Sequence, residues 1–315
     1  MDMPDFNPSI SVWRAKDGSV PIFDDPTLKF TMLRWQGRPD TNFEVTLFRV
    51  QTGQITKVDI EIAVALANAQ ALTEKQLRRM FRHRFRKDHE LATRLRFLQK
   101  LAWFDGWHME SDFNSREYTW TIGVAAQNYL RFVMGMTNLI NPFFNSRRCR
   151  FFLSVCAINE IKHQMMDLGV LQSENDFSFQ PYLGPNVDQP FAQVKMVTPF
   201  GPIVFYVERL DQTRKPIKFM SRRINMYLEL VEKNENQLPN PTKEQATSML
   251  LWSCGSEEAI REIVGSLYYL PENIPQLFIV DEEPDIRKAF RVVQKGEGEG
   301  EVMIRPFVWD FIATV

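Results

Sequence analysis

The most constraining feature of the sequence is a run of helix-start signals between residues 56 and 136. Thr56 is followed by Asp59, and Thr73 is followed by Gln76. In each case a polar partner stands three residues after the threonine, as in a capping box. After the second box, apolar residues recur at the spacing of one helical face, at Leu77, Met80 and Phe81. The pattern predicts a short alanine-rich helix and a second helix directly after it.

A third helix and a hairpin follow in the same segment. Asp88 is a candidate N-cap, and one face of the helix carries Leu91, Leu95, Leu98 and Leu101. Gly106 is placed to end a helical segment in the left-handed region. A polar tip over residues 111–116 then leads into a returning strand, Glu117–Ile122, and a fourth helix over Val124–Met136. Helix, helix, helix and hairpin is the order of a winged helix-turn-helix, predicted here over residues 56–136.

Charge is distributed unevenly along the chain. The whole sequence of 315 residues has a formal net charge of −1. Residues 71–100, however, carry ten basic and three acidic side chains, a net charge of +7 that leaves −8 for the other 285 residues. A sign asymmetry of this kind is typical of nucleic-acid contact, and a solvated helical face is the plain alternative.

Ten side chains of this basic module are candidates for contact with duplex DNA. The predicted turn supplies Arg82, Arg84, Arg86 and Lys87, where contacts with backbone phosphates are expected. The third helix supplies His89, Thr93, Arg94, Arg96 and Lys100, and some of these would reach a major groove. Arg116 would assist from the wing. A winged helix that binds protein is the alternative, in which case the chain is an adaptor in a DNA-processing complex.

The segments on either side of the basic module have simpler patterns. Residues 1–55 are predicted to be extended, with a half-buried strand where apolar and polar residues alternate over Phe43–Val50. Residues 137–186 are predicted to be a helical connector, built around a helix over Phe151–Met166. Cys156 and His163 share a face of that helix, and we expect them to pack in the core rather than to bind a metal.

Residues 187–315 alternate strands and helices. Two strands, over 191–197 and 203–207, flank a Pro-Phe-Gly-Pro turn and predict a hairpin. A long amphipathic helix over 217–231 follows, then buried strands over 249–253 and 275–280 with a helix after Ser256 between them. The predicted fold class of the whole chain is α+β, a winged helix-turn-helix domain followed by a small α/β domain with a mixed sheet.

Several short motifs of these segments carry a family resemblance. They are Leu72–Leu77, Arg94–Leu98 with Gly106, Tyr118–Gly123, Ala157–Glu160, Phe205–Thr213 and Arg223–Tyr227. The set resembles the replication-relaxation family, winged-helix proteins of Gram-positive plasmids and conjugative elements. The resemblance covers residues 56–280 with insertions. It implies duplex DNA binding in plasmid replication, conjugative transfer or their transcriptional control, and a C-terminal half similar to the restriction-endonuclease-like fold.

That nuclease fold implies a metal-binding Asp and a strand that carries Glu-x-Lys. Asp188 precedes one predicted strand, Glu208 ends the next, and Asp211 would add an oxygen. The lysine position, however, is Leu210, which cannot orient a water or a phosphate. The stand-ins, Lys195, Lys215 and Lys218, would have to approach from elsewhere. We therefore expect a degenerate, inactive domain in which Glu208 and Asp211 pair with Arg209, Arg222 or Arg223. A Mg²⁺-dependent nuclease using Asp188 and Glu208 is the alternative.

Composition sets the remaining expectations. No apolar run approaches the ~20 residues of a membrane helix. The N-terminus lacks the basic start and apolar core of a signal peptide. The three cysteines form no CxxC motif. We expect a cytoplasmic protein that needs no cofactor, apart from Mg²⁺ under the nuclease alternative. Its partners would be duplex DNA and proteins of a replication or transfer complex, without a membrane, and a homodimer is left open.

Overall fold

The computed structural model describes residues 14–33, 40–147, 149–171, 173, 176–211, 215–235, 237–240, 246–296, 298 and 300–309. Of residues 88, 146, 147, 149 and 150 it describes the backbone only. The chain forms two compact units. One is Thr27–Asn159, and the other combines Met1–Pro26 with Glu160–Val315. Each unit has its own sheet, and the fold is mixed α+β.

The unit Thr27–Asn159 is built on short helices whose starts are capped by side chains. Its helices are α1 (Phe43–Gln51), α2 (Lys57–Ala69), α3 (Glu74–Phe81), α4 (Asp88–Lys100), α5 (Val124–Phe132), the 3₁₀ turn η3 (Pro142–Arg147) and the start of α6 (Cys149–Asp167). Both predicted capping boxes are present. Asp59 accepts from the Thr56 backbone N–H at 2.6 Å, and Gln76 accepts from that of Thr73 at 3.0 Å. These contacts satisfy backbone groups that a helix leaves open at its start.

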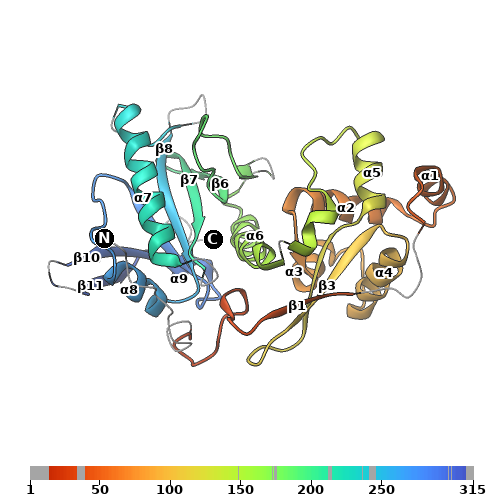
Figure 1. Cartoon of the computed structure of the whole chain (residues 1–315), viewed down its shortest axis with the longest axis horizontal. Helices are drawn as coiled ribbons and strands as arrows, with labels where there is room; N and C mark the ends of the chain where they lie inside the picture. Colours follow the sequence, from red (N-terminus) through yellow and green to blue (C-terminus); the bar gives the residue numbers. More distant parts are fainter. Residues whose placement is uncertain are drawn as a thin grey trace. The chain divides into compact units, whose positions relative to one another are not determined.

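The sheet of this unit is antiparallel, in the order β1-β3-β4-β2. Its strands are β1 (Lys29–Met32), β2 (Leu72–Thr73), β3 (Phe104–Glu110) and β4 (Glu117–Ile122). Strands β3 and β4 form the predicted hairpin, with Trp107 opposite Thr119. Helix α4 lies beside β3 (Figure 1). The apolar core between helices and sheet includes Leu95, Leu98, Trp103 and Trp120, each fully buried.

The predicted strand over Phe43–Val50 is wrong, because these residues form helix α1. Phe43, Leu47 and Val50 are spaced i, i+4 and i+7, so the segment also fits a helical period. The Asn42 side chain accepts a hydrogen bond from the Glu44 backbone N–H at 2.9 Å, which caps the helix. The Asn42 cap and the packing against α5 together favour the helix over the strand. Of the rest of the predicted extended segment, residues 1–13 and 34–39 lie outside the described residues.

Gly106 does not end a helix, as its position suggested, but lies inside β3. Helix α4 ends at Lys100, and the positive φ of 54° follows at Ala102. A β carbon at Gly106 would come within 2.8 Å of the Trp120 ring and of the Leu33 side chain. The glycine is therefore required by the close approach of an indole ring, and a turn plays no part.

The second unit contains a mixed sheet in the order β11-β10-β9-β8-β7-β6-β5. Its strands are β5 (Phe177–Phe179), β6 (Ala192–Thr198), β7 (Gly201–Arg209), β8 (Thr247–Cys254), β9 (Gln276–Val280), β10 (Phe290–Lys295) and β11 (Val302–Pro306). Strands β7, β8 and β9 are parallel, and the other pairs are antiparallel. The predicted hairpin is confirmed as β6 and β7, whose turn places Gly201 at a φ of 112°. The prediction of a mixed sheet is confirmed too.

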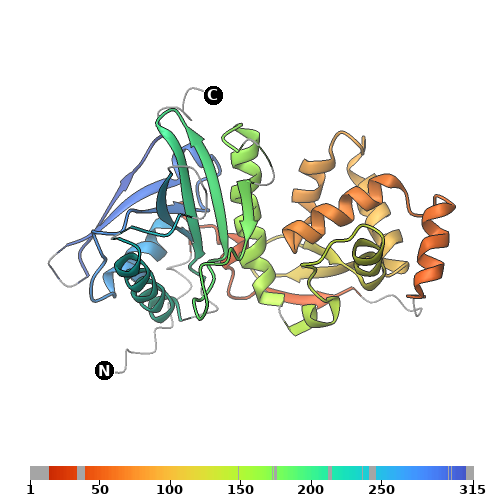
Figure 2. The same ribbon diagram turned by 90° about the horizontal axis from the view of Figure 1, so that it is seen from above.

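Two crossover helices cover one face of this sheet. They are α7 (Pro216–Lys233), which joins β7 to β8, and α8 (Glu257–Gly265), which joins β8 to β9. Figures 1 and 2 show α7 lying along the strands. The core on this face joins Tyr206 and Trp252 from the strands to Ile224 and Tyr227 of α7 and Ile260 of α8. The unit also contains the short helices η2 (Ile22–Asp24) and α9 (Ile286–Ala289).

The helix predicted over Phe151–Met166 is α6, and its two metal-capable side chains are packed in the interior. Cys156 is 1% exposed and His163 is 5% exposed. The Cys156 thiol lies 3.8 Å from the Ala71 carbonyl oxygen. Both side chains are therefore core residues, as predicted. No helix among the described residues has the length and apolar character that a membrane crossing requires.

Candidate functional site

Helix α4 presents an exposed stripe with positive charge at one end. His89, Thr93, Arg96 and Lys100 are spaced at intervals of four, three and four residues, so they lie on one face of the helix. All four residues are exposed. The opposite face carries Leu91, Leu95 and Leu98, each no more than 1% exposed. Four of the five candidates on this helix thus share a surface, and the apolar stripe holds that surface outward.

The turn between α3 and α4 carries four more cations of the predicted set. Arg82, Arg84, Arg86 and Lys87 are all exposed. The Glu90 carboxylate accepts hydrogen bonds from the backbone N–H groups of Arg86 at 3.0 Å and Lys87 at 3.3 Å, which fixes the start of α4. Arg84 is drawn to Glu61 of α2 at 3.2 Å, an exposed ion pair of the kind that contributes little energy. The turn therefore places exposed cations before the start of α4, and the cations of the stripe, Arg96 and Lys100, lie in the second half of the helix.

Arg94, the fifth candidate on α4, is placed differently. Its Nε donates to Asp59 at 2.9 Å, its guanidinium also forms an ion pair with the same carboxylate, and its Nη2 donates to the Gln54 carbonyl at 2.7 Å. Asp59 is 1% exposed and simultaneously caps α2 through Thr56. Arg94 is consequently a bridge between α4 and the start of α2, and its donors are turned away from a ligand.

The wing candidate, Arg116, lies in a cluster that links the hairpin to α4. Its guanidinium carbon is 5.9 Å from the centre of the Tyr118 ring, and that of Arg96 is 5.5 Å from the same ring. The His108 ring stacks on Tyr118 with centroids 5.3 Å apart. Arg116 also donates from Nε to His108 Nε2. Arg96 and Arg116, predicted as separate contacts, therefore both lie against the ring of Tyr118, and His108 holds Arg116 there; the sequence prediction missed both aromatic residues.

The neutral imidazole of His108 is suited to hold the Arg116 guanidinium. Burial, and then the positive charge of Arg116, lower the pKa of His108 below its ordinary value, and Glu110 opposes the shift. A neutral imidazole keeps a lone pair that accepts from the arginine. No local pattern in the sequence identifies this cluster, because His108 and Tyr118 become neighbours only through the register of the β3–β4 pair.

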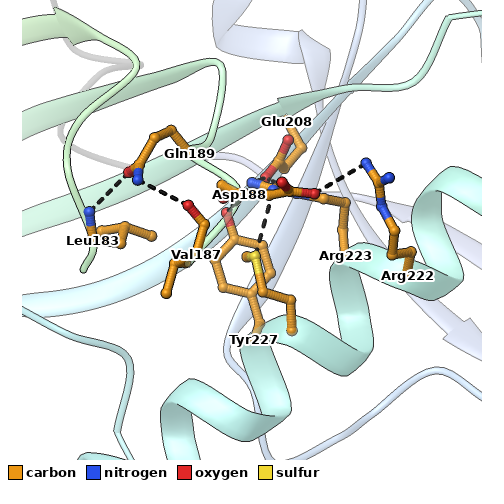
Figure 3. Close-up of polar contacts among 9 residues, drawn as sticks. Leu183, Val187, Asp188, Gln189, Glu208, Arg222, Arg223 and Tyr227 are labelled. Carbon is orange, nitrogen blue, oxygen red and sulfur yellow. Dashed lines mark hydrogen bonds and ion pairs between the residues drawn. The ribbon is translucent and has the colours of Figure 1, made fainter. Parts of the chain in front are cut away.

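The carboxylates proposed for metal binding lie beside α7. Glu208, at the end of β7, is 1% exposed. It accepts from Arg223 Nε at 2.6 Å and from the Tyr227 hydroxyl at 2.7 Å, and both partners come from α7 (Figure 3). Burial acts to lower the pKa of Arg223, but the charge of Glu208 raises it. Burial and the Glu208 charge also raise the pKa of Tyr227 well above its ordinary value, so the phenol keeps the proton it donates.

Asp188 is tied to the neighbouring arginine of the same helix. Its carboxylate lies 3.2 Å from Arg222 Nη2, with both side chains largely exposed, and its carbonyl oxygen accepts from Arg223 Nη1 at 2.6 Å (Figure 3). Asp188 and Glu208 are thus both held by adjacent arginines of α7, Arg222 and Arg223. A Mg²⁺ site needs free carboxylate oxygens with water, and the cationic side chains stand where a metal ion would be expected.

The other parts of a nuclease centre are placed elsewhere. Leu210, at the lysine position, is fully buried, and Asp211 is 4% exposed. Lys215 and Lys218 are exposed, and Lys195 is half-buried on β6. In the described part of the chain, no three His, Cys, Asp or Glu residues are grouped so that they could hold a metal ion. Burial raises the pKa of the Cys254 thiol to about 12, which keeps it protonated.

A third polar cluster, at the carboxyl ends of β7, β8 and β9, was not predicted at all. It is centred on Arg209, which is fully buried and pairs with Asp24 and Asp281.

Comparisons of the chain with protein-family models, with curated proteins and with solved structures found no match.

Proposed function

We propose that the unit Thr27–Asn159 contains a winged helix-turn-helix that binds duplex DNA. In this assignment α3 and α4 are the two helices of the motif, α4 is the recognition helix and the β3–β4 hairpin is the wing. The observation that carries the proposal is the α4 stripe of His89, Thr93, Arg96 and Lys100. It is exposed along its whole length and continues into the four basic residues of the preceding turn.

The positions within the stripe suggest which residues contact base edges and which contact phosphates. His89 and Thr93 lie toward the start of α4, the end of a recognition helix that meets base edges. Their side chains are short donors and acceptors suited to groove contacts. Arg96 and Lys100 lie further along, and Arg82, Arg86 and Lys87 precede the helix, where cations neutralise phosphates. Arg94 is left out of the interface because its donors are bound to Asp59 and Gln54.

For the second unit we propose a binding or structural role, without nuclease activity. The support is the engagement of Glu208 by Arg223 and Tyr227, together with Leu210 at the lysine position. The resemblance of the sequence motifs supports the further proposal that the DNA binding serves plasmid replication, conjugative transfer or their transcriptional control. A protein-binding winged helix acting as an adaptor remains the competing function.

The experiment is a titration of the full chain with a short duplex over a salt series. Binding that rests on phosphates weakens with a slope of about −0.9 per phosphate neutralised. The test variant is Arg82→Gln with Arg86→Gln and Lys87→Gln, which we expect to reduce both affinity and slope. The matched control is Arg131→Gln, an exposed arginine on α5 outside the candidate surface. A weak gel shift with equal losses in both variants would instead favour the adaptor.

A further inference from the structure

Two guanidinium groups without an acidic partner lie against a single aromatic ring. Arg96 comes from α4 and Arg116 from the end of the hairpin, and their guanidinium carbons are 5.5 and 5.9 Å from the centre of the Tyr118 ring. Within the described residues, neither arginine is paired with a carboxylate. This differs from Arg84 and Arg94, which are paired with Glu61 and Asp59.

The hairpin register explains why these groups meet. Tyr118 is opposite His108 across the β3–β4 pair, so both rings lie on the same face of the sheet. Arg116 precedes Tyr118 by two residues and so is directed to that face as well. Trp120 and Ile122, two and four residues further on, are buried on this face in the core that includes the α4 leucines. The cluster is therefore where the helix-facing side of the hairpin emerges from the core.

Each arginine is held in place by contacts that carry no negative charge. Cation–π contact with Tyr118 orients both guanidinium groups. His108 accepts from Arg116, and Arg116 Nη2 lies 3.0 Å from the other ring nitrogen, Nδ1. The Glu110 carboxylate lies 3.1 Å from the same Nδ1 of His108. The two cations are thus preorganised by rings, and within the described residues neither forms an ion pair with a carboxylate. Planar guanidinium donors in this state match the oxygens of a phosphate, which accepts several charge-assisted hydrogen bonds at once.

We propose that Arg96 and Arg116 together bind one backbone phosphate of duplex DNA and that Tyr118 is the positioning residue for both. The inference rests on the proposed function and deepens it, because it joins the recognition helix and the wing at one phosphate. Such a joint contact fixes the angle at which α4 enters the groove, since helix and hairpin are then anchored to the same point of the DNA backbone.

The test compares salt slopes of the full chain on one short duplex. Removing one phosphate contact lowers the magnitude of the slope by about 1. Because both side chains serve the same phosphate, Arg96→Gln combined with Arg116→Gln removes the contact and should lose about 1. Each single variant should lose no more than this, since the other arginine still faces the phosphate. Arg131→Gln is the matched control and should keep the wild-type slope. Tyr118→Phe keeps the aromatic ring and should keep the wild-type slope. Tyr118→Leu removes the ring and should lower the slope as the arginine variants do.

The outcomes distinguish a failure of the shared phosphate site from a failure of the proposed duplex DNA binding. A loss of about 2 in the double variant would assign the arginines to two phosphates and overturn the shared site. An unchanged slope in the double variant, with wild-type binding intact, would overturn it as well and leave the proposed function standing. A wild-type chain that shows no salt-dependent duplex binding would overturn both. Thermal unfolding of every variant identifies any loss that comes from misfolding.

Discussion

The Asp24 carboxylate accepts a hydrogen bond from the Arg209 guanidinium, 185 residues further along the chain. Both side chains are completely buried. Arg209 also lies 2.7 Å from Asp281 and donates to the Ser253 hydroxyl at 2.8 Å. A β carbon on Gly255 would be 2.3 Å from the Asp24 oxygen, so glycine is required for this carboxylate to enter. The segment around η2 is in this way an integral part of the larger sheet's unit.

Arg209 should matter more to stability than Asp24. Arg209→Met leaves the buried Asp24 and the partly buried Asp281 without their shared cation. Breaking a buried pair in this way costs about 3–5 kcal/mol. Asp24→Asn leaves Arg209 with Asp281 and keeps a polar group in place, so we expect a loss of about 1 kcal/mol. Denaturant unfolding followed by tryptophan fluorescence measures both. Equal losses would mean that Asp281 does not share the arginine.

The same cluster should make the free energy of unfolding depend on pH. Burial, opposed by Arg209, raises the pKa of Asp24 from 3.8 to about 7, and burial raises that of Asp281 as well. Between the two Asp24 values the folded chain keeps a proton that the unfolded chain has released. Stability is therefore lost as the pH rises from about 4 through about 7. The denaturant midpoint should fall over this window, and Asp24→Asn should flatten the fall.

Asp105 provides the matched comparison in the other unit. Burial alone raises its pKa from 3.8 to about 7, so the sign of its contribution is the same. Asp105→Asn should flatten the pH dependence of the unit Thr27–Asn159 and leave the part that is due to Asp24. A midpoint that rises between about pH 4 and about pH 7, the range set by the unfolded and folded pKa values of these groups, would contradict both assignments.

The sequence predicts the elements whose signals are local. The capping boxes at Thr56 and Thr73 each need only three neighbouring residues, and both are present in the structure. The segment Phe43–Val50 shows the limit of periodicity, because its apolar residues fit both a strand and a helix. The deciding contact, the Asn42 side chain on the Glu44 backbone, was readable in the sequence but was outweighed by the alternation.

Apart from the pairing of Glu208 with Arg223, which was among the expected pairs, long-range relationships could not be predicted from the sequence. The sign asymmetry located the basic surface, yet charge alone could not separate Arg94 from Arg96. Two positions on a helix turn the side chain by about 200°. Which of the two meets a buried carboxylate depends on where α2 lies. The pairing of Asp24 with Arg209 has no local signal of any kind, because it depends on how the N-terminal segment crosses the ends of three strands.

Arg94 and Arg96 should therefore respond differently to substitution. Arg94→Gln removes the partner of the buried Asp59, and we expect a loss of about 1–3 kcal/mol in unfolding free energy. Its salt slope on duplex DNA should stay that of the wild type in the folded fraction. Arg96→Gln should leave stability within about 0.5 kcal/mol, because the side chain is exposed, and should lower the slope. The reverse result would show that Arg94 contacts the DNA.

Glu208 should act as a structural partner of Arg223 and not as a metal ligand. Glu208→Gln keeps a side chain of similar shape but leaves the 2%-exposed guanidinium without its charge partner, so we expect a loss of about 3–5 kcal/mol. Asp188→Asn is the matched control, since its exposed pair with Arg222 is worth at most about 1 kcal/mol. A metal site predicts instead that both substitutions abolish activity. Incubation of the wild type with supercoiled DNA and Mg²⁺ or Mn²⁺ distinguishes the two. We expect no nicking, and nicking that both substitutions abolish in folded protein would assign Asp188 and Glu208 to a metal ion.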